Sequence, residues 1–302
     1  MIGTPQPLAE FYRDYYVPLR LIGASPKTVE QYEIALRHWK RFCGSLALSD
    51  IDDMALAAFV AALARSRSPA TVAKTLRHVM SIVRLAAKRA GVVPPDPPAV
   101  RVSRRIPEAF TIDQVEAILA ECRREPGSLA ALPASRWWPA LVLFVFDTGC
   151  RVGAALALVA DDLAIGERSV LLRAETQKQR ADQWHTLSDQ AIAAIAALYP
   201  RPGSLVFPWP YGRGVIYKRF RRILDRAGVP AGRERGGLFH KLRKTTASYV
   251  HANGGDATYQ LGHSSRQVTE RYLDPRIARN GQAIDVLPRP EMPIDDPQMT
   301  LF

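Results

Sequence analysis

The sequence predicts a mainly α-helical protein with a small antiparallel β-sheet, which places it in the α+β class. Apolar residues recur at helical spacing between turn signals over 1–95, and two short β-type segments flank a polar turn in the second half. A proline-rich stretch separates the two parts, and 302 residues suffice for two domains. We expect a helical domain over 1–95, a linker over 96–108, a second domain over 109–287 and a mobile acidic tail over 288–302.

The helical domain shows clear helix starts. Ser25-Pro26 and Ser68-Pro69 predict two of them, because a proline in the first turn needs no N–H partner. Asp50 and Asp52 are alternative caps for the helix between these two. Residues that recur on one face of the predicted helices are Phe11, Tyr12, Tyr15, Tyr16 and Leu19, then Val29, Tyr32, Ala35, Leu36 and Trp39, then the inward-facing Val72, Leu76, Val79, Met80, Val83 and Leu85.

The linker begins with Val93-Pro94-Pro95-Asp96-Pro97-Pro98, and consecutive prolines favour an extended chain over a helix. A basic run follows it. Two interpretations stay open: a solvated linker, or a strap along a phosphate backbone. The residues that we expect to contact DNA in the second case are Arg101, Arg104 and Arg105, together with Lys74 and Arg77 of the preceding helix.

The second domain mixes helices with a β-hairpin. Its strands are expected over Ser169–Arg173 and Gln183–Leu187, with a polar turn over Gln177–Ala181. Pro200-Arg201-Pro202-Gly203 marks a break before Leu205-Val206-Phe207. Helices are expected over 111–124, 137–148, 152–159, 213–227, 238–252, 255–261, 265–272 and 276–286.

Composition indicates a polyanionic partner. The formal net charge is +12 and the isoelectric point about 9.9, with a hydrophobic fraction of 47% that is typical of globular proteins. Three widely spaced cysteines without a CxxC pair argue against structural zinc and fit a reducing compartment. No membrane span or signal peptide is evident, so we expect a cytoplasmic protein associated with the nucleoid.

Five separated side chains have the chemistry to hold and cleave a phosphodiester. Cleavage by a protein hydroxyl needs a nucleophile, cations on the non-bridging oxygens and an acid for the leaving group. Arginine suits the second task, because its planar fork grips two phosphate oxygens. The candidates are Arg151, His240, Arg243, His263 and Tyr272; His240 and Arg243 share a helical face at i, i+3.

This ordered set resembles the catalytic domain of the tyrosine recombinases, also called the phage integrase family. Order and approximate spacing agree over most of 110–280, and the helical segment 1–95 is similar to the core-binding domain of the family. The matching stretches are Asp147-Thr148-Gly149-Cys150-Arg151, Lys178, His240-Lys241-Leu242-Arg243, Leu261-Gly262-His263-Ser264-Ser265 and Thr269-Glu270-Arg271-Tyr272-Leu273-Asp274-Pro275.

The resemblance implies a site-specific recombinase that cleaves and rejoins duplex DNA through a 3′-phosphotyrosyl intermediate without metal, ATP or other cofactor. It implies two protomers per site, a tetramer on two sites and possible sister recombinases as partners. The implied roles are nucleophile for Tyr272, phosphate clamp for Arg151 and Arg243, proton acceptor for His240, phosphate hydrogen bond for His263 and general acid for Lys178. Arg180 is a neighbouring alternative to Lys178.

The chain departs from the family at Ala154, where an acidic residue is usual. Such a carboxylate would buttress the site, and we expect Asp147, Asp161 or Asp162 to offset its loss, unless activity is lowered. The alternatives to a recombinase are a type IB topoisomerase-like nicking-closing enzyme and a catalytically silent DNA-binding regulator of a mobile element.

The C-terminus carries a second, shorter resemblance. Gln298, Leu301 and Phe302 are similar to the short peptide by which bacterial replication proteins dock on the β sliding clamp. Apolar anchors with a directional amide suit a groove on a protein partner. A chance match, or a tail that packs onto a neighbouring protomer, are the alternatives.

Overall fold

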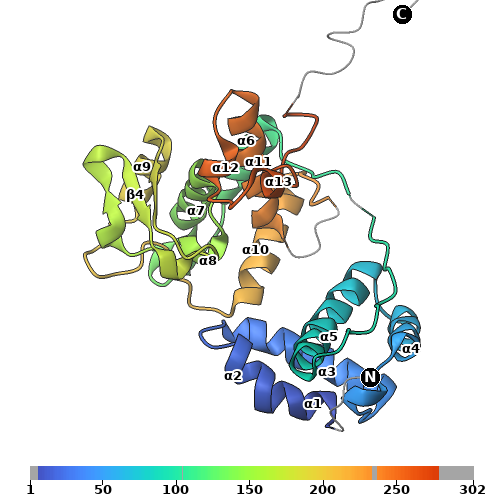
Figure 1. The fold of residues 1–302 in the computed structure, drawn as a ribbon. Coiled ribbons are helices and arrows are strands. Elements are labelled where there is room, and N and C mark those ends of the chain that lie inside the picture. Colours follow the sequence, from blue (N-terminus) through green and yellow to red (C-terminus); the bar gives the residue numbers. More distant parts are fainter. Residues whose placement is uncertain (1–5, 104, 233–236, 279–302) are drawn as a thin grey trace, which may run out of the picture. The chain divides into compact units, whose positions relative to one another are not determined.

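The computed structural model describes residues 6–103, 105–232 and 237–278. The chain divides into two compact units, Met1–Arg104 and Arg105–Phe302, and each is described by itself (Figure 1). Within these described ranges no helix has the length and apolar character needed to cross a membrane. The fold is mostly helical with small antiparallel sheets, as the sequence predicts.

The N-terminal unit is helical throughout. Side chains of Ser25 and Ser68 accept hydrogen bonds from the N–H groups of Thr28 and Thr71, which confirms both predicted helix starts. Asp52, rather than Asp50, caps the helix between these two starts, over Asp53–Ala64. The elements are α1 (Leu8–Phe11), a π-helix (Tyr12–Tyr16), α2 (Val17–Arg20), α3 (Pro26–Cys43), a 3₁₀ turn (Leu48–Asp50), α4 (Asp53–Ala64) and α5 (Pro69–Ala90).

The first helix is not the uniform helix that its pattern suggests. The N–H of Val17 bonds the carbonyl of Tyr12, five residues back, so the helix widens into a π-turn. Pro18 follows directly and has no N–H for an α-helical bond. The wider turn shifts the side-chain phase, and Tyr15 and Leu19 are 38% and 52% exposed although they share the expected face.

Helices α3, α4 and α5 pack their apolar faces together into one hydrophobic core. The rings of Trp39 and Phe59 lie 5.0 Å apart, and both side chains are buried. The inward face predicted for α5 is confirmed except at Leu85, which is half-buried, while Ile82 takes a core position that the pattern did not single out. The opposite face of α5 is therefore left to polar side chains.

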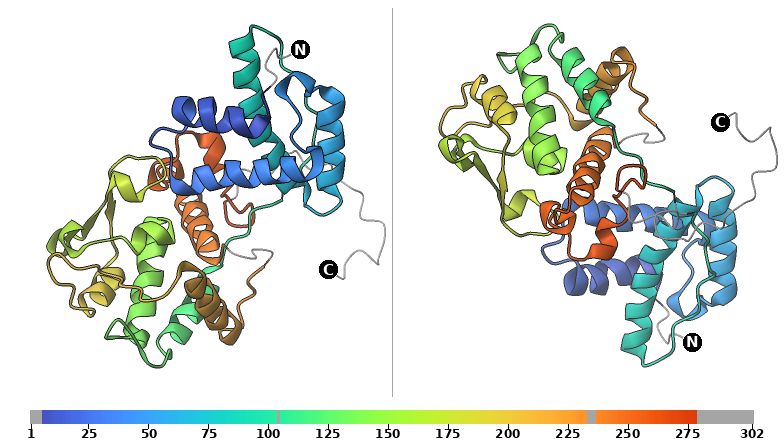
Figure 2. Two further views of the ribbon diagram at one scale, coloured as in Figure 1. Left: turned by 90° about the horizontal axis from the view of Figure 1, so that it is seen from below. Right: turned by 90° about the horizontal axis from the view of Figure 1, so that it is seen from above.

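The second unit surrounds one buried helix. Its elements are α6 (Ile112–Cys122), β1 (Ser128–Leu129), β2 (Leu132–Pro133), α7 (Ala134–Thr148), α8 (Val152–Ala155), β3 (Leu163–Ala164), β4 (Ser169–Leu172), β5 (Gln183–Thr186), α9 (Asp189–Ala196), α10 (Arg213–Arg226), α11 (Leu238–Ala252), α12 (Ala257–Gln260) and α13 (Arg266–Thr269). Strands β3, β4 and β5 form an antiparallel sheet in that order. In Figures 1 and 2, α7 lies between this sheet with α9 and helix α11.

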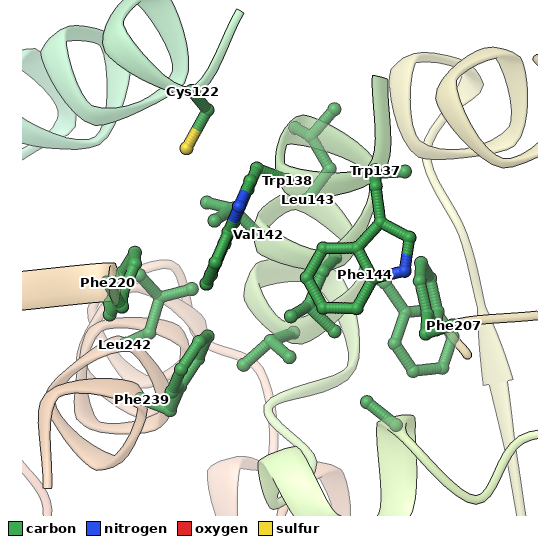
Figure 3. Close-up of a cluster of buried hydrophobic side chains, with 14 of the residues drawn as sticks. Cys122, Trp137, Trp138, Val142, Leu143, Phe144, Phe207, Phe220, Phe239 and Leu242 are labelled. Carbon is green, nitrogen blue, oxygen red and sulfur yellow. The ribbon is translucent and has the colours of Figure 1, made fainter. Parts of the chain in front are cut away.

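Aromatic side chains on both sides of α7 fix its position. Trp138 stacks on Phe220 of α10, with ring centroids 6.1 Å apart, and Phe220 stacks on Phe239 of α11. Trp137 meets Phe207 on the other side (Figure 3). All five rings are at most 2% exposed. The N-terminal half of α7 is thus held by packing on both flanks, and nearer its C-terminal end the buried Phe144 contacts Phe207, with ring centroids 5.4 Å apart.

Several expected elements differ from those observed. The helix expected over 152–159 ends at Ala155, because Leu158 and Val159 turn to pair with the backbone of Leu205 and Val206. The helices expected over 255–261 and 265–272 shrink to α12 and α13. Residues 276–278 form a turn instead of a helix start, and the rest of 276–286 lies outside the described residues.

Other elements were missed. Helix α9 begins at a serine cap, Ser188, whose hydroxyl accepts from Ala191 N–H at 3.2 Å. Strands β1, β2 and β3 have two residues each, too few for an alternating pattern to show.

His185 on β5 is a buried polar group with an unmet hydrogen-bonding atom. It is 6% exposed, and its Nε2 has no hydrogen-bond partner among the described residues. Burial, and secondarily the Arg243 charge, lower the pKa of His185 to about 4 from 6.5. The folded state therefore holds this imidazole neutral, while the unfolded chain takes up a proton below pH 6.5.

We predict that His185→Val stabilises the protein. An unpartnered buried polar atom costs about 1–3 kcal/mol, and valine suits a buried strand. At neutral pH the gain should be of that order. It should grow as the pH falls from 6.5 towards about 4, because wild type loses stability there and the variant lacks this group. Denaturant unfolding at several pH values measures this; an equal or lower free energy of unfolding at every pH contradicts it.

Candidate active site

Arg151 stands at the junction of α7 and α8. Helix α7 ends at Gly149, which has φ +62°, and a Cβ there would lie 2.7 Å from Leu261 Cδ2. Glycine is required at this position for two reasons: the backbone is left-handed, and a side chain would clash with Leu261. Arg151 is the N-cap residue of α8 and is half-buried. The position of its side chain thus depends on the turn that Gly149 makes possible.

Arg243 joins three separate motifs. It lies on α11, is 2% exposed, and its Nη1 donates a hydrogen bond to the carbonyl of Gly149. Its Nη2 donates to the carbonyl of Leu261 at 2.7 Å and bonds His263 Nε2 at 3.1 Å. Burial, followed by the charge of Arg151, lowers the pKa of Arg243 to about 10. The guanidinium therefore remains charged at neutral pH.

The hydrogen bonds of His263 define its tautomer. Arginine donates only, so Nε2 must accept from Arg243, and the proton of the neutral ring lies on Nδ1. Nδ1 then donates to Thr269 Oγ1 at 3.0 Å, and Thr269 Oγ1 donates to Thr258 Oγ1 at 3.0 Å. Burial, then Arg243 and Arg151, lower the pKa of His263 to about 4. The chain of bonds and the pKa agree on a neutral ring.

Tyr272 lies among these groups. Its ring centroid is 4.6 Å from the His263 ring and 4.9 Å from the His240 ring, and 5.6 Å from Arg243 Cζ. Its N–H donates to the carbonyl of Thr269 at 2.7 Å, at the end of α13. The structure thus gathers His240, Arg243, His263 and Tyr272 around one point, with Arg151 near enough to lower the pKa of Arg243.

Lys178 occupies the turn of the β4–β5 hairpin. It is exposed and has no hydrogen-bond partner within the described part of the chain. Its neighbour Gln179 reaches the site: Gln179 Oε1 accepts from Arg151 Nη1 at 3.2 Å, and Gln179 Nε2 donates to Gln177 Oε1 at 2.9 Å. Arg180, the alternative to Lys178, is also exposed and has a positive φ of 53°.

Glutamines that the sequence analysis did not single out fasten this hairpin to the histidine-bearing turn. Gly262 has φ +59°, and a Cβ on it would overlap Gln179 Nε2 and lie 2.7 Å from Gln183 Oε1. Gln183 Nε2 donates to the carbonyl of Tyr259. Gln260 Nε2 donates to the carbonyl of Asp147 at 2.8 Å. The glutamines clustered around the polar turn are the sequence feature that could have indicated these contacts.

The expected replacement for the missing acid at Ala154 is wrong. Asp147 accepts from the backbone and hydroxyl of Ser188, Asp161 accepts from the N–H of Gly203, and Asp162 pairs with Arg173. Ala154 itself is buried. Among the described residues, the acceptors on Arg151 and Arg243 include an amide, two carbonyls, an imidazole and the Tyr272 hydroxyl, and none of them is a carboxylate. The site keeps its positive charge uncompensated by these carboxylates.

Comparison with known sequences identifies the class. The model of the phage integrase family matches residues 108–279, more than half of the chain. Tyrosine recombinase XerD of Mycobacterium tuberculosis (strain CDC 1551 / Oshkosh) is 26% identical over 282 residues, covering 83% of this chain and 88% of the relative. Tyrosine recombinase XerC of Mesorhizobium japonicum is 28% identical over 282 residues, covering 84% and 87%. The fold and these relatives define a site-specific DNA recombinase of the tyrosine type.

The chain belongs to the phage integrase family. Solved structures show the same fold at low sequence identity. A variant of the Tn1549 transposon integrase in complex with a circular intermediate DNA has a TM-score of 0.71 at 13% identity, covering 89% of this chain and 95% of that one. A lambda integrase tetramer bound to a Holliday junction has a TM-score of 0.68 at 19% identity, covering 93% and 80%. The predicted family, fold class and enzyme class are confirmed.

We predict that Gln179→Glu slows DNA cleavage. A carboxylate would hold Arg151 in an ion pair, stronger than the present bond to a neutral amide by about 1 kcal/mol, and we expect that a substrate phosphate must displace it. Cleavage should fall by about fivefold to tenfold, measured as the rate of covalent adduct formation. Gln190, an exposed residue of α9, is the control: Gln190→Glu makes the same charge change away from Arg151 and should leave the cleavage rate unchanged. Equal rates for both variants would contradict the competition.

Proposed function

We propose that Tyr272 is the nucleophile of a DNA strand-transfer reaction. Its Oη attacks the scissile phosphorus, an Oη–P bond forms, and the P–O5′ bond breaks, which leaves a 3′-phosphotyrosyl link. His240 takes the phenol proton, and Lys178 gives a proton to the departing O5′. The observation that carries this proposal is the position of the Tyr272 ring against His240, His263 and Arg243.

Arg151 and Arg243 are proposed to hold the non-bridging phosphate oxygens. Their hydrogen-bond acceptors are neutral, so their charge is available to a phosphate. His263 at present accepts from Arg243, so in this state it orients that guanidinium. A phosphate anion would offset the effect of the two arginines on the pKa of His263 and favour a protonated ring that donates to oxygen.

The covalent link keeps the phosphodiester bond energy. Attack by a 5′-hydroxyl on the phosphotyrosine reverses the first step, restores the phenol and needs no ATP. Attack by the 5′ end of a partner strand gives a recombinant strand, whereas attack by the original end only reseals a nick. Recombinant product from two target sites therefore separates recombination from the topoisomerase-like alternative.

The test is a nicked substrate that loses its short 5′ fragment after cleavage and traps the adduct. Wild type should form a covalent protein–DNA adduct, and Tyr272→Phe should form none, because the ring remains but the hydroxyl is gone. Denaturing gel electrophoresis measures the adduct. Tyr259→Phe, an exposed tyrosine nearby on α12, is the matched control and should react like wild type. No adduct with wild type would favour the silent DNA-binding regulator.

Two helices offer basic faces to DNA. Helix α5 contains no Asp or Glu, and its exposed Lys74, Arg77, Arg84 and Lys88 recur at heptad spacing along one stripe. On α10, a second basic face that the sequence analysis missed includes the exposed Lys218 and Arg222, four residues apart. We propose that both contact phosphates.

The linker arginines are proposed to act in the same way. Arg101 and Arg105 are exposed, and Arg104 lies outside the described residues. We propose that 1–95 is the core-binding domain and 109–287 the catalytic domain, joined by 96–108 and closing as a clamp around duplex DNA. The tail 288–302 lies outside the described residues.

We predict that Lys74→Ala/Arg77→Ala lowers the salt dependence of DNA binding. Each lost phosphate contact reduces the slope of log K against log salt by about 0.9, so the pair should reduce it by about 2. Titrations at several salt concentrations measure the slope. The control is Arg123→Ala/Arg124→Ala, which removes the same charge at the end of α6, where Glu121 pairs with Arg124. An equal change in both double variants would contradict a contact specific to α5.

Assembly and location follow from the same function. Binding to duplex DNA, a tetramer on two sites and pairing with sister recombinases are proposed; the lambda integrase tetramer on a Holliday junction supports such an assembly. The reaction would take place on cytoplasmic, nucleoid DNA. Docking on a sliding clamp through Gln298, Leu301 and Phe302 also stays a proposal, since these residues lie outside the described part of the chain.

A further inference from the structure

Asp274 is a fully buried carboxylate two residues beyond Tyr272. It is 0% exposed, and its Oδ2 accepts from the N–H of Ala109 at 2.7 Å. Arg276 donates to both oxygens, from Nε at 3.0 Å and from Nη2 at 2.5 Å. The N–H of Asp274 donates to Ser248 Oγ on α11 at 2.9 Å. Three parts of the chain therefore converge on this residue.

The ionised form of Asp274 is the one that fits this environment. Burial alone would raise its pKa, but hydrogen bonds from Arg276 and from the N–H of Ala109 lower it below the ordinary value of 3.8. The carboxylate offers acceptors only, and every group directed at it is a donor. A neutral amide of the same shape could not satisfy all of these donors.

Ala109 belongs to the segment by which the chain enters the second unit. The next N–H groups of that segment are also fixed by side chains of α11: Phe110 donates to Thr245 Oγ1 at 2.9 Å, and Ile112 donates to Tyr249 Oη at 3.2 Å. Helix α11 also carries His240 and Arg243. The incoming segment is thus fastened to the same helix as two site residues, and Asp274 fastens the Tyr272 segment to both.

We propose that Asp274 is a positioning residue that sets where the Tyr272 hydroxyl stands relative to Arg243. This inference rests on the proposed role of Tyr272 as nucleophile. Two residues span at most about 7 Å, so a displacement at Asp274 is transmitted to Tyr272 with little slack. On its other side, Tyr272 follows α13, a helix of 4 residues that gives little independent support. Movement of the incoming segment at Ala109 would act on the nucleophile through the same carboxylate.

The main test is Asp274→Asn, measured as the adduct-forming rate at saturating DNA. A misplacement of about 1 Å can cost about 100-fold in rate, so we expect a loss of about 10- to 100-fold. The DNA dissociation constant should stay within about twofold, since Asp274 is buried and away from solvent. Glu121→Gln is the matched control. It also weakens a carboxylate–arginine pair, with Arg226, in a residue 9% exposed, and its adduct rate should match wild type.

A second substrate separates positioning from other defects. With sulfur in place of the bridging O5′, the leaving thiolate needs no protonation. Lys178→Ala should then recover most of its lost rate, because its defect lies in the leaving group. Asp274→Asn should keep its full loss, because the attacking oxygen is still misplaced. Recovery of Asp274→Asn on the sulfur substrate, or a wild-type rate on the ordinary one, would overturn the proposal.

Ser248→Ala keeps the test decisive if Asp274→Asn does not fold. It removes the acceptor of the Asp274 N–H and leaves the carboxylate in place. We expect a smaller loss of adduct-forming rate, and the sulfur substrate should not restore that rate. An unchanged rate would count against the proposal. Failure of the proposed function looks different: wild type would form no adduct, or Tyr272→Phe would form one.

Discussion

The second unit is organised by the buried guanidinium of Arg243, which has no carboxylate partner among the described residues. Taking the Arg243 charge out of water costs several kcal/mol unless hydrogen bonds replace its hydration. The carbonyls of Gly149 and Leu261 and the His263 ring supply such bonds to the two Nη atoms, whereas Nε is buried without a partner among the described residues. Gly149 closes the 15-residue helix α7, whose C-terminal end carries a partial negative charge. Phe144, one turn before that end, is buried against Phe207, and Thr246 of α11 donates to the carbonyl of Phe146, so the position of the Gly149 carbonyl depends on the packing of the core (Figure 3).

Neutral hydrogen-bond acceptors leave the positive charge of Arg151 and Arg243 available to a phosphate, which carboxylate acceptors would not. A carboxylate on either arginine would fix its geometry but also cancel the charge that a phosphate needs. Carbonyls and amides fix geometry and leave the charge. The usual acid of the family is replaced by Ala154, and Asp147, Asp161 and Asp162 are all engaged elsewhere. The two arginines are oriented instead by the carbonyls of Gly149 and Leu261, by His263 and by Gln179.

Features that depend on neighbouring residues in the sequence were predicted correctly, whereas individual contacts between distant residues were missed. Helix starts at Ser25 and Ser68 were correct because a cap and its helix lie within a few residues. His240, Arg243, His263 and Tyr272 lie together, with Arg151 close by, as the resemblance implied, because spaced motifs carry that information. Lys178 is exposed in the hairpin turn, and its catalytic role stays a prediction. The bonds of Asp274 to Ala109 and of Arg151 to Gln179 join residues 165 and 28 positions apart and leave no periodic trace. Asp147 turned to Ser188 for the same reason: its partner is set by packing of α9 on α7.

The two arginines differ in how ready they are for a phosphate. Arg243 is buried and already bonded by two carbonyls and an imidazole, so its position changes little when an anion arrives and no reorganisation is required. Arg151 is half-buried and bonds Gln179, whose amide oxygen occupies a site that a phosphate oxygen could take. Releasing Gln179 also loosens its packing on Gly262, and Lys178 is its direct neighbour. In the proposed mechanism, a phosphate that binds Arg151 displaces Gln179, and this displacement also frees the β4–β5 turn that carries Lys178. Arg243 and Tyr272 keep their positions during this step.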